Sequence, residues 1–194
     1  MTTDQILDFL GLAATLKTVC RHCDTAPGRR ESVADHLGRL GLFAWLVREE
    51  FPGVDMRHVL DICLVHDLGE AITGDIPCFE KTPAHEQAEE EAWTRIADRL
   101  PAAKGDELLR LLTEYRDAET PEAQVARALD KLEGVIAHNE ADIDSWLPHE
   151  YRLNLTYATD ECAAWPPLAE LRRAVREQTE EKIRRESPHN TAKN

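Results

Sequence analysis

Apolar residues recur every three or four positions along most of this chain, and this spacing limits what it can fold into. The first segment shows the pattern in Ile6, Phe9, Leu10, Ala13 and Leu16. Such spacing places the apolar side chains on one face of an α-helix. No segment has the alternating pattern of a half-buried strand, and no internal repeat or low-complexity linker interrupts the chain. The sequence therefore predicts an all-α fold.

Capping and helix-breaking residues set the expected helix boundaries. Ser32 and Asp55 can each cap a helix that follows them, and Pro52-Gly53 separates the two. The other expected helices cover roughly 84–99, 105–118, 121–142 and 168–187, and the helix after Asp55 runs to about 69. At 194 residues the chain can form one domain with a full core. We expect that domain over residues 1–187, with its core at about 10–160, and a flexible tail over 188–194.

Charge and composition exclude several classes of partner. The net charge of −14 argues against binding polymeric nucleic acid, but it allows a small phosphorylated ligand. The chain has no apolar run long enough to cross a bilayer and no basic segment ahead of its first apolar stretch, so we expect a cytoplasmic protein. Reduced thiols are then expected for the five cysteines, and Cys20 and Cys23 lack the second ligand pair of a structural zinc site.

The stretch "LVHDLGEAITGDIP" places His66, Asp67, Glu70 and Asp75 directly after an apolar helix. Burying several ionisable groups costs free energy unless something compensates their charge. His36 lies on the apolar side of the preceding helix. Taken alone, His36 fits a core histidine, and His66 with Asp67 fits a buried, hydrogen-bonded pair.

A third helix adds Asp130, which is flanked by small residues at helical spacing. Three apolar-faced helices that each direct ionisable groups inward are better explained by a shared divalent metal ion. Two imidazoles and two carboxylates, without a thiolate, suit manganese, cobalt, nickel, zinc, iron or magnesium in an open site.

These residues also occur in the order of a known family. The segments "LKTVCR", "ESVADH", "HDLGEAITGDIP", "EEEAW" and "ALDKLEGVIAHNEADIDSW" resemble the HD-domain phosphohydrolases, in the branch that contains the 5'-deoxynucleotidases. The resemblance covers residues 10 to 160 or so. It implies a single HD-domain helical bundle with one divalent metal ion between its helices. The metal ligands it implies are His36, His66, Asp67 and Asp130.

The resemblance further implies a homodimer that hydrolyses (deoxy)nucleoside 5'-monophosphates to nucleoside and phosphate. Glu70 and Asp75 match the catalytic acidic residues of the family. We assign Glu70 to orienting and deprotonating the water, and Asp75 to the leaving group or the sugar, although the two roles could be exchanged. Without the resemblance, these residues fit a helix-end charge and a turn residue.

Arg21 matches the arginine of the family that binds phosphate, and Lys17, one turn earlier, could add positive charge. The sequence departs from the family just after Arg21. His22 and Cys23 stand where relatives usually have a tryptophan that shapes the nucleoside pocket. The loop "DTAPGRR" also adds Arg29 and Arg30, which could serve a larger substrate. Another small phosphorylated metabolite is therefore an alternative substrate.

Two other functions compete with phosphate-ester hydrolysis. An HD-type di-iron oxygenase would need further histidines between His66 and Asp130, and the sequence offers only His85 there. A helical binding protein with a relict metal site would not need Glu70, Asp75 and Arg21 together with the ligand set. Both alternatives account for fewer of the observed residues than a hydrolase does.

Overall fold

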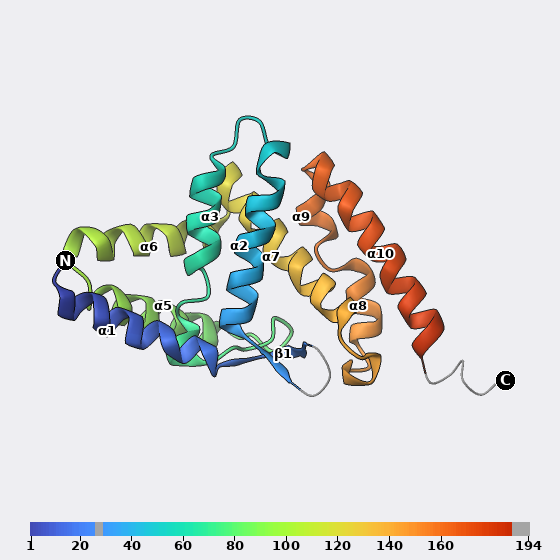
Figure 1. Ribbon diagram of the computed structural model, residues 1–194, viewed down its shortest axis with the longest axis horizontal. Helices are drawn as coiled ribbons and strands as arrows, with labels where there is room; N and C mark the ends of the chain where they lie inside the picture. The colour runs from blue at the N-terminus through green and yellow to red at the C-terminus, as the bar shows by residue number, and fades with distance from the viewer. Residues whose placement is uncertain (26–28, 188–194) are drawn as a thin grey trace. The chain divides into compact units, whose positions relative to one another are not determined.

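The computed structural model describes residues 1–25 and 29–187 (Figure 1). The expected tail over 188–194 lies outside the described residues. The chain groups into two compact units. The first comprises Met1–His22 and Glu31–Ala126, and the second comprises Cys23–Arg30 and Arg127–Asn194. Helices form nearly all the regular structure of the described part, which confirms the predicted all-α class.

The first unit is a set of packed helices joined by short turns. Its elements are α1 (Thr3–Ala13), η1 (Ala14–Lys17), α2 (Val33–Val47), η2 (Arg48–Glu50), α3 (Met56–Val65), α4 (Glu70–Thr73), α5 (Pro83–Ala97) and α6 (Ala102–Asp117). Helix α3 packs against α2 and α6, and α5 packs against α4 and α6. Helix α7 (Pro121–Glu140) begins in this unit and continues into the second.

Side-chain caps fix the starts of the two helices that lead into the site. The Ser32 hydroxyl accepts a hydrogen bond from the Asp35 N–H at 3.1 Å, and the Asp35 carboxylate accepts one from the Ser32 N–H at 2.9 Å. The Asp55 carboxylate likewise accepts hydrogen bonds from the N–H groups of Arg57 and His58. Both predicted caps are confirmed. Helix α3 ends at Val65, however, and a tight turn over 66–69 connects it to α4.

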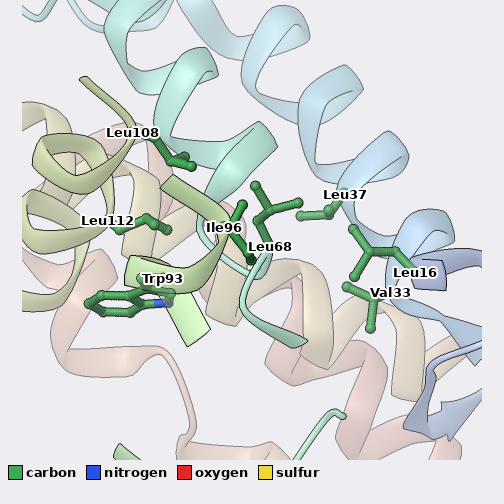
Figure 2. Packing of buried hydrophobic residues seen from close by; sticks show 8 residues of the cluster. All are labelled: Leu16, Val33, Leu37, Leu68, Trp93, Ile96, Leu108 and Leu112. Carbon is green, nitrogen blue, oxygen red and sulfur yellow. The ribbon is translucent and has the colours of Figure 1, made fainter. Parts of the chain in front are cut away.

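An apolar cluster holds the first unit together (Figure 2). Its buried members are Leu16, Val33, Leu37, Leu68, Trp93, Ile96, Leu108 and Leu112. Leu68, inside the turn that follows α3, lies beside Ile96 of α5 in Figure 2. Leu68 thereby anchors the turn that carries His66 and Asp67 and leads into Glu70.

A short hairpin corrects the expectation that the chain contains no strand. Strands β1 (Cys20–Asp24) and β2 (Arg30–Ser32) pair into a two-stranded sheet. Near the tip of the hairpin, the Thr25 N–H donates to the Arg29 carbonyl at 3.0 Å. The sequence "CRHCD" has no apolar alternation, because strands this short are stabilised by pairing rather than by an apolar face. The hairpin leads directly into the Ser32 cap of α2.

The second unit is organised around α10 (Pro166–Glu186). This helix packs against η3 (Ile143–Ser145), α8 (Glu150–Thr156) and α9 (Thr159–Ala163). Arg172 is buried on α10, and its guanidinium donates to the carbonyls of Tyr157 at 2.7 Å and Asn154 at 3.0 Å. These bonds satisfy carbonyls at the C-terminal end of α8. Within the described residues, no helix combines the length and the apolar character needed to cross a membrane.

Candidate metal centre

His36, His66 and Asp67 form a group of converging ligand atoms in the first unit. Helix α2 buries His36 completely, and His66 follows the last residue of α3. One donor atom from each of the three side chains lies within 4.8 Å of the others. The Asp67 Oδ2 atom is 3.1 Å from the His66 Nε2 and 3.7 Å from the His36 Nε2. The three predicted ligands of this unit are therefore brought together.

The backbone orients His66 for coordination. Its Nδ1 atom lies 3.0 Å from the Cys63 carbonyl, which can only accept a hydrogen bond. The Nδ1 therefore carries the proton, and the Nε2 presents its lone pair on the side of Asp67. A lone pair 3.1 Å from a carboxylate oxygen calls for a proton or a cation between them. These nitrogen and oxygen donors fit a divalent ion.

The Tyr115 side chain of α6 covers the other side of His66. The two rings lie 4.6 Å apart, centroid to centroid, and the His36 ring meets the His66 ring edge-on at 5.7 Å. Sequence reasoning missed Tyr115, because α6 carries no motif that separates it from an ordinary core aromatic. Packing by Tyr115 restricts the rotation of His66 and so preserves the direction of its Nε2.

Glu70 and Asp75 lie next to this group, where their negative charges would repel each other and the charge of Asp67. Glu70 is the first residue of α4, and its side chain is almost fully buried. Burial, together with the charges of Asp67 and Asp75, raises the pKa of Glu70 to about 10. Burial also raises the pKa of Asp75 above its ordinary value, and Asp67 adds to this increase. Without a cation, these surroundings favour the protonated form of both carboxyl groups.

Arg21 provides positive charge to both carboxyl groups. It lowers the pKa of Glu70 and of Asp75, partly offsetting the effect of burial. On the neighbouring strand β2, Glu31 is buried and its Oε2 atom lies 3.3 Å from the Arg21 Nε. This ion pair fixes the guanidinium plane through Nε. In the sequence, the signal that could have identified Glu31 as a site residue is its position in "ESVADH", directly before the cap of α2.

Sequence reasoning also missed Lys81, in the loop between α4 and α5. Its Nζ lies 3.1 Å from the Glu89 Oε2, and its charge lowers the pKa of Asp75. A lysine eight residues before its acidic partner, with a proline between them, follows no helical spacing that a sequence search would detect.

The remaining residues that the sequence singled out are described by their own elements. Asp130 is half-buried on the part of α7 that belongs to the second unit, so its role as fourth ligand stays a prediction. Lys17 is exposed at the end of η1. Arg30 pairs with Asp24 at 3.4 Å in the hairpin. His85 lies on α5 and does not belong to the group formed by His36, His66 and Asp67.

Comparisons with known proteins find relatives over most of the chain. A family model described as "HD domain" matches residues 13–172. The 5'-deoxynucleotidase hdd1 of Schizosaccharomyces pombe is 34% identical over 136 residues, covering 66% of this chain and 68% of its own. The 5'-deoxynucleotidase HDDC2 of Homo sapiens is 33% identical over 139 residues, covering 70% and 67%. A "Predicted metal-dependent phosphohydrolase" from Magnetospirillum magnetotacticum, a crystal structure, matches with a TM-score of 0.81 at 26% identity, covering 92% of this chain and 95% of that one.

Proposed function

The chain belongs to the HD-domain family, and from this premise we propose that it is a metal-dependent phosphomonoesterase acting on deoxynucleoside 5'-monophosphates. The observation that carries the proposal is the convergence of His36, His66 and Asp67 beside two buried carboxyl groups. The names of the relatives hdd1 and HDDC2 support the choice of substrate.

One divalent ion per chain would be held by His36, His66 and Asp67, with Asp130 as the fourth ligand. When bound, such an ion lowers the pKa of a coordinated water molecule and polarises the phosphoryl oxygens. The donor set suits manganese, cobalt, nickel, zinc, iron or magnesium. The two aspartates would balance the charge of a divalent ion, which removes the cost of burying them together.

The chain itself supplies the proton transfers and the phosphate contact. Glu70 orients the water and would accept its proton once the charge of a bound divalent ion offsets the burial and the carboxyl charges that raise its pKa in the metal-free protein. Burial raises the pKa of Asp75, which favours a proton on its carboxyl group for delivery to the departing O5' atom. Arg21, fixed through Nε by Glu31, directs its remaining N–H groups to the phosphate. Lys17, which is exposed at the end of η1, adds positive charge.

A second candidate substrate is another small phosphorylated metabolite. The observation that favours it is the residue after Arg21. His22 stands there in place of an aromatic nucleoside platform, and its ring contacts Phe79 edge-on at 5.9 Å. We propose that this His22–Phe79 pair, and not a tryptophan, borders the base and sugar next to Arg21, so that substrate selectivity depends on it.

A phosphate-release screen tests the proposal. Purified protein would be assayed with every ribo- and deoxynucleoside 5'-monophosphate and with simple sugar phosphates, each in the presence of manganese, cobalt, nickel, zinc or magnesium. The Asp67→Asn variant serves as the matched control, because it removes one ligand charge at constant size. Release from deoxynucleotides alone is the expected result. Release from sugar phosphates alone would retain the mechanism and reject the nucleotide. No release from any ester would reject the function.

We further propose that the protein is a cytoplasmic homodimer. Exposed apolar side chains on α2 support an interface with a second copy. They are Leu42, Trp45 and Leu46, which are 67%, 57% and 72% exposed. Leu64 of the adjacent helix α3 adds to this apolar surface. Several large apolar side chains on one helix face favour a protein partner over water.

A further inference from the structure

We propose that Lys81 binds the substrate phosphate as a second cation beside Arg21, and that Glu89 positions it. This inference rests on the proposed phosphomonoesterase function and identifies a further residue of the same site. The substrate class it requires is a phosphomonoester dianion, whose two charges exceed what one guanidinium neutralises.

The turn after α3 brings Glu89 close to the site. A Cβ atom on Gly69 would lie 2.8 Å from the Trp93 Nε1 and 3.4 Å from the Glu89 Cγ. The glycine thus allows α5 to approach the turn more closely than any other residue would. Because Gly69 precedes Glu70, this approach places the middle turns of α5, with Glu89 and Trp93, beside the turn that leads into Glu70. The Glu89 carboxylate there is paired with the Lys81 ammonium.

Glu89 holds the Lys81 ammonium at the edge of the site. The Nζ–Oε2 distance is 3.1 Å, and the Glu89 side chain is only 17% exposed, compared with 36% for Lys81. The anchor is therefore more deeply buried than the group it positions. A lysine ammonium has three N–H donors, so the bond to Glu89 leaves two for a ligand.

The charge of the Lys81 ammonium interacts electrostatically with several carboxyl groups. Burial of the ammonium lowers its pKa, but Glu89, Asp67 and Glu70 more than offset this and raise the pKa of Lys81 above its ordinary value. Lys81 in turn lowers the pKa of Asp75, as Arg21 does. The ammonium therefore lies within electrostatic range of the three acidic residues assigned to metal binding and proton transfer. The reacting phosphate must occupy this same region.

Direct binding of inorganic phosphate, the reaction product, tests the inference separately from turnover. Calorimetry would compare manganese-loaded wild-type protein with Lys81→Met, Lys81→Arg and Glu89→Gln. A charge-assisted hydrogen bond predicts that Lys81→Met weakens phosphate binding about 10- to 100-fold. Lys81→Arg should recover most of the affinity. Glu89→Gln should lose about 3- to 10-fold, because the ammonium keeps its charge but loses its anchor.

Kinetics and a surface control complete the test. Lys81→Met should raise KM for the best nucleotide by a similar factor, with a smaller change in kcat. Lys104→Met removes a lysine from an exposed pair with Glu107 on α6 and should leave both measurements unchanged. Equal phosphate affinity of Lys81→Met and wild type, or no phosphate binding by wild type, would overturn the inference. Tighter manganese binding by Lys81→Met with unchanged phosphate affinity would also overturn it, since Lys81 would then only offset the negative charge of the carboxylates. Wild-type protein that binds phosphate but cleaves no ester would refute the proposed function alone.

Discussion

At the scale of single residues, Glu70 is a carboxyl group whose surroundings disfavour its ionised form. Burial and the neighbouring Asp67 and Asp75 raise its pKa to about 10 in the metal-free protein, well above the value of about 4.5 in the unfolded chain. A folded-state pKa above the unfolded value stabilises the protein at low pH, and this stabilisation is lost as pH rises between the two values. Glu70 therefore costs stability at neutral pH in return for its role in proton transfer.

The Glu70→Gln variant separates the effect of Glu70 on stability from its effect on turnover. Glutamine carries no charge, so the metal-free variant should be more stable than wild type by about 1 kcal/mol or more at pH 8, or about 2–4 °C in Tm. This advantage should grow as pH rises from 4.5 toward 10. Turnover by the metal-loaded variant should fall at least about a hundredfold.

Thermal unfolding across pH, paired with phosphate release, measures both effects. Glu107→Gln, on the exposed face of α6, controls for the loss of a carboxyl group. Unchanged turnover in Glu70→Gln would remove Glu70 from proton transfer. A metal-free variant no more stable than wild type at pH 8 would show that its carboxyl group is not strained by burial.

At the scale of elements, two helices meet closely because α6 carries a glycine. A Cβ atom on Gly105 would lie only 2.7 Å from the backbone oxygen of Ala97 on α5. Backbone cannot move aside as a side chain can. The close contact therefore fixes α5, whose Trp93 and Glu89 support the turn that carries Glu70.

Gly105→Ala should destabilise the protein by about 1–3 kcal/mol, because the overpacking cost exceeds the gain in helix propensity. Gly38→Ala is the matched control, since a Cβ atom on this α2 residue meets nothing within 4 Å. The control should gain about 0.5–1 kcal/mol. Equal stabilities of the two variants in urea unfolding would contradict the close contact of α5 and α6.

In the second unit, His138 links α7 to α8. Its Nδ1 donates to the Gly134 carbonyl at 2.9 Å, and its Nε2 lies 3.0 Å from the Glu150 Oε1. Burial of the imidazole lowers its pKa, but hydrogen bonding to Cys23 and Glu150 outweighs this and raises the pKa to about 10. The structure thus shows a partly buried ion pair between two helices.

His138→Gln should cost about 1–3 kcal/mol of unfolding free energy below pH 6.5, where the charge-assisted bond contributes fully. The contribution of a raised pKa is lost as pH rises through the folded value, so the cost should decline between pH 6.5 and about 10. Urea unfolding at pH 6, 8 and 9.5 measures this trend, with exposed His149→Gln as control. A cost independent of pH would show that His138 contributes through packing alone.

Local signals explain which elements could be predicted. Ser32 and Asp55 cap their own helices, so the starts of α2 and α3 follow from a few adjacent residues. The hairpin could not be predicted, because its strands depend on pairing with each other rather than on an apolar pattern. Lys81 and Tyr115 were missed for a related reason. Their roles arise from contacts with Glu89 and His66, which are set by packing of α5 and α6.

At the scale of the whole molecule, a homodimer would cover the apolar face of α2. Wild-type protein should therefore elute with about twice the 21.9 kDa mass of one chain in size-exclusion chromatography with light scattering. Leu42→Lys combined with Leu46→Glu should yield monomers. Leu7→Glu changes an equally exposed leucine on α1 and should leave the dimer intact. A monomeric wild type, or a double variant that remains dimeric, would contradict this interface.

We propose that residues 1–187 form one hydrolytic domain and that Asp130 on α7 is its fourth metal ligand. Asp130→Asn should then weaken metal binding, which a titration with manganese measures.

The most direct measurement is a titration of metal-free protein with manganese, following bound ion and phosphate release from deoxynucleoside 5'-monophosphates together. We predict that activity rises to a plateau at one ion per chain, and that His66→Ala and Asp130→Asn shift the titration to higher manganese concentration. Saturation at two ions, or a fully loaded protein that releases no phosphate, would contradict the account.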